Sequence, residues 1–336
     1  MLQAAERADG RSATVAGARR IAVLVPCYNE EAAISRVVAD FGASLPDAVI
    51  YVYDNNSTDR TVEAARAAGA TVRTESRQGK GYVVRRMFSD IDADVYVLVD
   101  GDATYDAPSA RLLVTRLIEG GLDMVVGARR DQEQAAYRFG HRFGNRLLTG
   151  FVAQVFGATF EDLLSGYRVF SRRFVKSFPG LSGGFEIETE LTVHALNLEL
   201  PVDEIETPYF ARPEGSVSKL STWRDGLRIL RTIVRLYRAE RPLPFFCGIG
   251  LALAVASIAL AIPIIITYVE EGLVPRFPTA VLSTGLMILA CLAVTCGIVL
   301  DTVTRGRREM KMLAYLAQRA SGDSEGMAGG GVGARS

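Results

Sequence analysis

The segment Val95-Tyr96-Val97-Leu98-Val99-Asp100-Gly101-Asp102 carries the strongest signal in this chain. Its five apolar residues predict a buried β-strand, and the strand ends at two aspartates separated by one glycine. In an extended segment that spacing places both carboxylates on the same face. Mg²⁺ and Mn²⁺ prefer oxygen ligands and commonly use one or two carboxylates together with phosphate oxygens. We therefore predict a divalent-cation site at Asp100 and Asp102.

Similar strands flank this segment along the chain and alternate with helical stretches. The expected strands are Ile21–Val25, Val49–Tyr53, Thr71–Thr74 and Met124–Gly127, and the intervening helices include Glu31–Phe41 and Thr61–Ala68. This alternation predicts an α/β domain over residues 21–220. Its sheet should be mostly parallel and Rossmann-like, with helices on both faces.

Polar residues follow the first two strands as well. The first strand runs into Pro26-Cys27-Tyr28-Asn29-Glu30, and the second into Asp54-Asn55-Asn56-Ser57-Thr58-Asp59. Ligands of such sheets bind outside the carboxyl ends of the strands, so these segments and Asp100–Asp102 should border one site. Turn and helix-capping chemistry is the alternative explanation for each segment taken alone.

Two apolar runs lie near the C-terminal end of the chain. Leu243–Tyr268 and Thr279–Leu300 contain no Asp, Glu, Lys or Arg. Each exceeds the roughly 20 residues that a helix needs to cross about 30 Å of hydrocarbon. Buried helices of a soluble protein are the alternative, but two such runs in succession favour a transmembrane hairpin within residues 242–303.

The charges around these runs indicate an orientation. The connector carries Glu270, Glu271 and Arg276, whereas arginines at 231–241 and 305–308 flank the outer ends. The positive-inside rule then places both termini and the N-terminal domain in the cytosol. We expect a multi-pass protein of the inner (cytoplasmic) membrane.

A helix just before the first run should be amphipathic. Arginines recur at steps of four and three from Arg224 to Arg238, which is one face of a helix over residues 221–241. Such a helix can lie among lipid headgroups, with its arginines near lipid phosphates. Packing on the soluble domain is the alternative. Residues 1–20 are expected to be a disordered tail, and residues 304–336 a cytosolic basic segment with a second disordered tail.

Composition excludes some classes of protein. The 336 residues include 38 basic and 38 acidic ones, so the net charge is zero. This balance argues against a protein that coats nucleic acid. The four cysteines form no C-x-x-C pair, so neither a zinc site nor a disulfide framework is indicated.

Seven motifs together resemble those of glycosyltransferase family 2, whose GT-A fold binds nucleotide sugars. They are Val25–Glu31, Asp54–Asp59, Gly79-Lys80-Gly81, Asp100-Gly101-Asp102, Gly127-Ala128-Arg129, Asp162–Arg168 and Arg212–Lys219. The resemblance covers roughly residues 20–240. It points to the polyprenyl-phosphate branch, with dolichol-phosphate mannose synthases and bacterial undecaprenyl-phosphate glucosyltransferases. Asn55 and Ala103-Thr104 depart from the pattern, which more often has a second acid and Leu-Gln there.

The resemblance implies a role for each matching residue. Donor-nucleotide binding falls to Pro26, Tyr28, Glu30, Asp54, Lys80 and Asp100. Mg²⁺ or Mn²⁺ would be held by Asp100 and Asp102, and the catalytic residues would be Asp102 and Asp162. The donor diphosphate or the acceptor phosphate would meet Arg129, Arg138, Arg142, Arg212 and Lys219.

Three of these assignments have a plain structural alternative. Asp162 could cap a loop near Ser165, Arg138 and Arg142 could belong to a solvated basic loop, and Gly79-Lys80-Gly81 could be a turn.

The reaction implied is inverting transfer of a hexose from a UDP- or GDP-linked donor to polyprenyl phosphate at the cytosolic face, for glycan or lipid modification. A cation and basic side chains would stabilise the charge on the departing diphosphate. The acceptor phosphate is already anionic near pH 7 and needs positioning more than a base. The alternatives are a glycosyltransferase acting on another lipid or a growing glycan, and an inactive GT-A-like membrane scaffold. A homo-oligomer is compatible with each.

Overall fold

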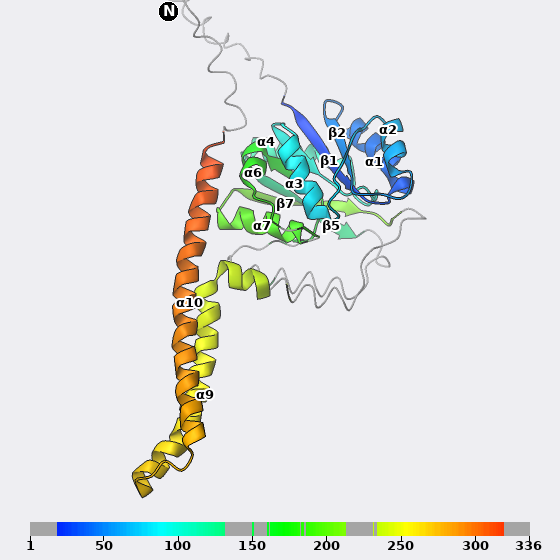
Figure 1. The fold of residues 1–336 in the computed structure, drawn as a ribbon. Coiled ribbons are helices and arrows are strands. Elements are labelled where there is room, and N and C mark those ends of the chain that lie inside the picture. Colours follow the sequence, from blue (N-terminus) through cyan, green and yellow to red (C-terminus); the bar gives the residue numbers. More distant parts are fainter. Residues whose placement is uncertain are drawn as a thin grey trace, which may run out of the picture.

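The structure, a computed structural model, describes residues 19–131, 150, 160, 162–181, 183–184, 186–212, 231 and 234–318. An α/β domain is followed by two long helices (Figure 1). The strands are β1 (Ile21–Cys27), β2 (Val49–Asp54), β3 (Thr71–Thr74), β4 (Val95–Leu98), β5 (Met124–Asp131), β6 (Arg168–Ser171) and β7 (Val202–Tyr209). The helices are α1 (Glu31–Ser44), α2 (Thr61–Ala67), α3 (Lys80–Asp90), α4 (Ser109–Glu119), α6 (Arg172–Ser177), α7 (Ile187–Asn197), α9 (Pro242–Glu271) and α10 (Phe277–Leu316).

Within the described residues, seven strands form one sheet in the order β3-β2-β1-β4-β6-β5-β7. Strands β1 to β4 pair in parallel, β6 runs antiparallel between β4 and β5, and β5 is parallel to β7. Only β6 therefore runs against the others in this part of the chain. The predicted α/β architecture with a mostly parallel sheet is confirmed, and each of the five predicted strands is present. β6 and β7 come in addition.

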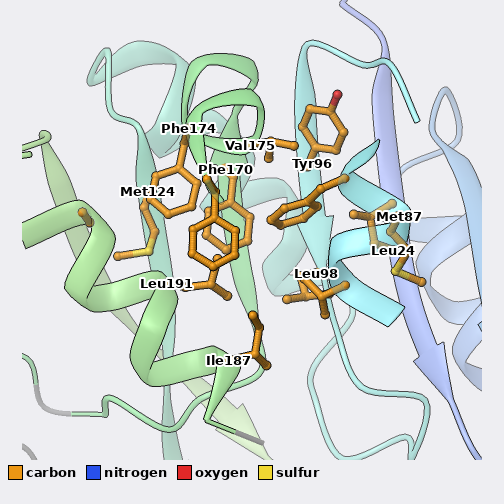
Figure 2. Packing of buried hydrophobic residues seen from close by; sticks show 14 of the residues in the cluster. Leu24, Met87, Tyr96, Leu98, Met124, Phe170, Phe174, Val175, Ile187 and Leu191 are labelled. Atoms are coloured by element: carbon orange, nitrogen blue, oxygen red, sulfur yellow. The ribbon is translucent and has the colours of Figure 1, made fainter. Parts of the chain in front are cut away.

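Apolar side chains cover both faces of the sheet, because successive residues of a strand point to opposite sides. On one face α1 and α4 contribute Ile34 and Leu113. On the other face α3 and α6 contribute Met87 and Phe174 to the cluster that contains Phe170 of β6, and Phe174 lies beside Phe170 (Figure 2). The rings of Phe170 and Phe174 stack with their centroids 4.7 Å apart. The predicted placement of helices on both faces is thus confirmed.

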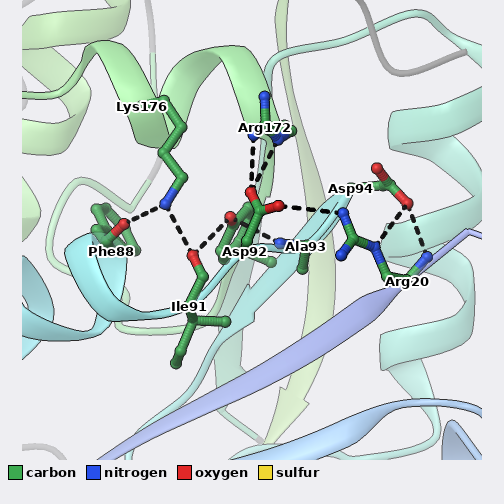
Figure 3. A network of polar contacts seen from close by, with 9 residues as sticks. Arg20, Phe88, Ile91, Asp92, Ala93, Asp94, Arg172 and Lys176 are labelled. Atoms are coloured by element: carbon green, nitrogen blue, oxygen red, sulfur yellow. Dashed lines mark hydrogen bonds and ion pairs between the residues drawn. The ribbon is translucent and has the colours of Figure 1, made fainter. Parts of the chain in front are cut away.

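A polar network joins the beginnings of β1 and β4 to α6 (Figure 3). Arg172 donates to Asp92 at 2.8 Å, and Arg20 donates to the same carboxylate at 3.2 Å. Lys176 Nζ donates to the backbone carbonyls of Phe88 and Ile91. These contacts fix the amino edge of the sheet, where the parallel strands begin. The acidic strand ends identified from the sequence lie at the opposite, carboxyl edge.

Helices α9 and α10 run side by side as a hairpin (Figure 1). Their most apolar windows have mean hydropathies of 2.7 and 2.3, so both helices are long and apolar enough to cross a membrane. Small residues make the contact between them. The Ser257 and Ser283 hydroxyls each donate to the other residue's carbonyl, at 2.8 and 2.9 Å, and Gly250 lies against the backbone of Ala290.

The second long helix does not end with its apolar run. It continues past Leu300 to Leu316, through part of the segment predicted to be a basic region and tail. Of the predicted amphipathic helix over 221–241, residues 234–240 are helical, and most of the remainder lies outside the described residues. The tails at 1–18 and 319–336 also lie outside them.

Candidate active site

A cleft of about 300 Å³ opens at the carboxyl ends of β1, β2 and β4. These strands pair in parallel, so the loops that follow them meet at one edge. Seven predicted site residues line the cleft: Pro26, Tyr28, Glu30, Lys80, Asp100, Asp102 and Arg212. The chain thus brings together residues that are up to 186 positions apart in the sequence numbering.

Lys80, at the start of α3, lies between two carboxylates. Its Nζ is 2.5 Å from Asp100 Oδ1 and 2.5 Å from Glu188 Oε1. Burial lowers the pKa of Lys80, but the two carboxylates outweigh burial and hold this pKa above its ordinary value. The ammonium group therefore stays charged in the folded protein.

Glu188 is a site residue that the sequence analysis missed. It lies in the first turn of α7, is 4% exposed, and its Oε2 has no hydrogen-bond partner in the described structure. A glutamate among other acids of a helix gives no local signal that it will reach a lysine 108 positions earlier in the chain. Its carboxylate completes the enclosure of the Lys80 ammonium.

Asp102 is buried and meets Arg212, which follows β7. Arg212 Nη2 lies 2.7 Å from Asp102 Oδ2, and Arg212 Nη1 lies 4.0 Å from Glu30 Oε1. Thr104 Oγ1 donates to the other oxygen of Asp102 at 2.6 Å. Burial and the adjacent charge of Asp100 raise the pKa of Asp102. A cation next to this carboxylate is therefore stabilising, and here Arg212 provides it.

The residues at this edge that could hold a divalent cation are Asp100 and Asp102, which pair with Lys80 and Arg212 in this structure. Within the described residues, no group of three or more His, Cys, Asp or Glu side chains is arranged to hold a metal. Asp100 and Asp102 alone supply two carboxylates, which is the number that Mg²⁺ or Mn²⁺ commonly takes when phosphate oxygens complete its shell. The two residues fit such a cation only together with a bound diphosphate.

The motif assigned donor binding to Asp54, but in the structure it is the neighbouring Asn55 that lines the cleft. The Asp54 carboxylate accepts the backbone N–H of Ser57 at 3.2 and 3.3 Å and closes the turn after β2. Asn55, rather than Asp54, lines the cleft. Its Oδ1 accepts from the N–H of Gly79 at 2.7 Å, and its Nδ2 donates to the carbonyls of Glu75 and Arg77 at 2.8 and 2.7 Å. The amide that replaces the usual second acid thus holds the loop before Lys80, and a donor contact of Asp54 stays a prediction.

Asp162 forms a buried ion pair with Arg129. Arg129 Nε and Nη2 lie 2.6 and 2.8 Å from the two carboxylate oxygens, and the Arg129 backbone N–H donates to the same carboxylate at 3.2 Å. Burial raises the pKa of Asp162, but the hydrogen bonds from Arg129 outweigh burial and hold this pKa below its ordinary value. The carboxylate is therefore charged and directed at Arg129. The contact with Ser165 that the loop-cap alternative predicted is made by the backbone carbonyl of Asp162, which accepts from the Ser165 N–H at 3.4 Å.

Gly166 joins the Asp162 motif to the cleft. A Cβ at this position would lie 2.5 Å from Asp100 Oδ2, so only glycine permits this approach. The Gly166 N–H donates to the Tyr105 hydroxyl at 2.9 Å. Arg138, Arg142 and Lys219 lie outside the described residues, and their roles stay predictions.

Comparison with known proteins gives one family match. The description "Glycosyl transferase family 2" applies to residues 22–178. Glycosyltransferase AglJ of Haloferax volcanii is 33% identical over 299 residues, which cover 88% of this chain and 98% of AglJ. A dolichyl-phosphate hexose transferase of the same organism is 29% identical over 221 residues, 66% of this chain and 95% of the relative.

The fold also resembles that of a solved enzyme. Glucosyl-3-phosphoglycerate synthase from Mycobacterium tuberculosis, crystallised with Mn²⁺, uridine-diphosphate-glucose and phosphoglyceric acid, matches with a TM-score of 0.53 and 23% identity. The match covers 65% of this chain and 79% of the synthase. At that identity the likeness shows a shared fold.

Proposed function

The chain belongs to glycosyltransferase family 2, and on that premise we propose that it transfers a hexose from a UDP- or GDP-linked donor to polyprenyl phosphate at the cytosolic face of a membrane. The observation that carries the proposal is the cleft where Asp100, Asp102, Lys80 and Arg212 meet, in a chain that continues into two apolar helices. The dolichyl-phosphate hexose transferase among the relatives supports a lipid phosphate as acceptor.

The charged groups of the cleft suit a nucleoside diphosphate. We assign the donor phosphates to Lys80 and Arg212, which stand 2.5 and 2.7 Å from Asp100 and Asp102. The two aspartates would hold Mg²⁺ or Mn²⁺, and the Mn²⁺ and UDP-glucose bound by the structural relative support this assignment. Such a cation, when bound, would stabilise negative charge on the departing diphosphate.

The transfer itself exchanges one carbon–oxygen bond for another. An oxygen of the acceptor phosphate attacks the anomeric carbon from the face opposite the diphosphate. The electron pair of the broken bond leaves with the nucleoside diphosphate, so the configuration at the anomeric carbon inverts. No proton has to be removed, because the attacking oxygen is already anionic near pH 7.

Asp162 then acts as a positioning group rather than as a base. A carboxylate with a lowered pKa that is bound at both oxygens by Arg129 is a poor proton acceptor. It does fix the guanidinium of Arg129, which we assign to the acceptor phosphate. Arg138 and Arg142 are proposed to serve the same phosphate.

The proposal is tested with the full-length protein in membranes. UDP- and GDP-linked hexoses carrying a radiolabel are offered with Mg²⁺ or Mn²⁺ and polyprenyl phosphate, and the lipids are then extracted. We expect label in a lipid-extractable phosphodiester only when the polyprenol is phosphorylated. Asp102→Asn should lower the rate at least about 100-fold, the scale of losing one preorganised electrostatic contact.

Three results would contradict this function. Equal labelling of the unphosphorylated alcohol would exclude the phosphate as nucleophile. Label found only in a water-soluble glycan would favour a different acceptor. Absence of donor turnover with every nucleotide sugar would favour an inactive scaffold.

We further propose that both termini are cytosolic and that the connector is on the other side of the membrane. The support is the acidic connector with Glu270 and Glu271 against the arginines at both outer ends. Reporter fusions within residues 270–276 and at the C-terminus test this topology. A connector in the cytosol would overturn it.

A further inference from the structure

The charged end of α10 extends well beyond the apolar run. Asp301–Leu316 continues the helix without a break and carries Arg305, Arg307, Arg308, Glu309 and Lys311. At about 1.5 Å per residue, this part adds about 24 Å of helix. We name Asp301–Leu316 the docking segment, because the α/β domain is attached to it (Figure 1).

Asp123 is the centre of this attachment. It stands just before β5, is 4% exposed, and its Oδ2 accepts from the Tyr315 hydroxyl of the docking segment at 2.8 Å. Its Oδ1 accepts from Ser171 Oγ at the end of β6, and its backbone N–H donates to the carbonyl of Pro201 just before β7. One buried aspartate therefore joins α10 to three strands of the sheet.

Further contacts fix the rotation of the docking segment. The Arg173 guanidinium of α6 lies over the Tyr315 ring, 5.5 Å from its centroid. Arg308 Nη2 lies 2.6 Å from Glu199 Oε1 in the turn between α7 and β7. Met312 and Tyr315 pack against the apolar core of the domain. These side chains lie at positions 308, 312 and 315, which share one face of the helix.

The attachment lies at the edge of the sheet opposite to the cleft. Asp123 and Glu199 precede β5 and β7, and Ser171 ends the antiparallel β6, so all three mark the amino edge. The cleft lies at the carboxyl edge. A rigid helix held at one edge determines where the opposite edge points relative to the apolar hairpin.

We propose that the docking segment is a positioning element for the reaction. Through Tyr315 and Arg308 it holds the cleft at a set height and rotation above the bilayer. This placement makes transfer selective for an acceptor phosphate that is confined to the membrane surface. This inference rests on the proposed function. A water-soluble acceptor diffuses to the cleft from any direction and does not need this placement.

Changes in helix length test the proposal in the full chain. The insertion site is after Gly306, where a Cβ would meet nothing within 4 Å and which lies before Arg308. Seven inserted alanines move Arg308, Met312 and Tyr315 about 10 Å farther from the apolar run and leave their rotation about the helix axis within about 20° of the original. One inserted alanine moves these contact residues by about 1.5 Å but turns them by about 100° about the helix axis.

Each variant is reconstituted in liposomes and offered two acceptors. One is a long-chain polyprenyl phosphate in the bilayer, and the other is a short, water-soluble isoprenyl phosphate. We expect the seven-residue insertion to lower kcat/KM for the long acceptor at least about tenfold, because a misplacement of even 1 Å can be costly in rate. The kcat/KM for the short acceptor and the KM of the donor should change less than about twofold, which is the deviation expected for sites that do not share contacts.

Point variants provide the matched controls. Tyr315→Phe removes only the hydroxyl bound to Asp123 and should reduce use of the long acceptor selectively. Tyr268→Phe makes the same change at the connector end of α9, where the ring is exposed, and should have no effect. Arg308→Glu should reduce use of the long acceptor, and Glu199→Arg combined with it should restore the rate.

The outcomes separate this inference from the function on which it rests. Equal losses with both acceptors would show a merely structural role, and unchanged rates with both would show that the docking segment does not set the placement. Either result overturns the inference while the wild-type transfer stands. A wild-type chain that modifies neither acceptor contradicts the proposed function itself, and the inference with it.

Discussion

Replacing Asn55 with aspartate would restore the acid that related motifs more often have, and the structure predicts that this change is harmful. Asn55 is 4% exposed. Its amide nitrogen donates to the carbonyls of Glu75 and Arg77 at 2.8 and 2.7 Å, while its oxygen accepts from the N–H of Gly79. In Asn55→Asp a carboxylate oxygen faces both carbonyls, and both donated hydrogen bonds are lost.

The size of the effect follows from these contacts. Each lost hydrogen bond lowers the free energy of unfolding by about 1 kcal/mol, and the buried carboxylate oxygen that faces the two carbonyls lowers it by at least about 1 kcal/mol more. The expected loss is about 3 kcal/mol, or roughly 6–12 °C in Tm for a domain of this size. Since the loop before Lys80 is released, the KM of the nucleotide donor should also rise.

Thermal unfolding of the full-length protein in detergent, followed by intrinsic fluorescence, measures the loss. Asn56→Asp is the matched control, because Asn56 is exposed and its amide donates to Ser76 and Gln78 of the same loop. That variant should lose less than about 1 kcal/mol. The deficit of Asn55→Asp should shrink as the pH falls, because the protonated carboxyl can donate one hydrogen bond again. Equal stability losses in the two variants, or no loss at Asn55, would refute the reasoning.

Three further predictions follow from buried contacts. Arg129→Met removes the cation that is paired with the buried Asp162 carboxylate, so the free energy of unfolding should fall by about 3–5 kcal/mol, measured by denaturant unfolding; a fall below 1 kcal/mol would mean that the pair is solvated. Burial, with Lys311 nearby, lowers the pKa of His194 to about 3. Between pH 3 and about 6.5 the unfolded chain therefore binds more protons than the folded one, so the free energy of unfolding should fall as the pH falls through this window. Between pH 8 and pH 5 the wild-type chain should lose about 2 kcal/mol more than His194→Gln, and identical losses would contradict the shift. Gly250→Ala places a Cβ 3.0 Å from the Ala290 carbonyl and should cost about 1–3 kcal/mol in detergent melts, whereas Gly248→Ala meets nothing and should be neutral.

Much of the fold could be predicted because its signals are local. Strand Val95–Val99 and the acids after it are adjacent in the chain, so the local pattern identifies the strand and the acids at its end. The two carboxylates do not follow from an extended segment, because β4 ends at Leu98 and residues 101–102 form a turn. Parallel pairing then places Pro26–Glu30 beside Asp100–Asp102. The two apolar helices were predictable for the same reason, since a run of about 20 uncharged residues is a local property.

β6 and β7 were not predicted, and their sequences show why. β6 has only four residues and begins at Arg168, a fully buried arginine that donates to the Leu163 and Ser165 carbonyls. β7 carries three acids in eight residues and reads as a solvated segment. Both strands pair with β5, and this pairing satisfies their backbone N–H and C=O groups. The sequence pattern within either strand does not reveal such a distant partner.

The sequence by itself determined the α/β class, the acidic strand ends and the presence of two apolar helices, because each depends on neighbouring residues; it did not determine where the second helix ends, at Leu316. Only the tertiary structure decided which polar side chains meet: Glu188 with Lys80, Arg129 with Asp162, and the Tyr315 hydroxyl with Asp123, 192 positions away. A charged side chain is compatible with many partners along the sequence. Burial selects one of them, since a charge removed from water must be paired where the packing of the elements places it.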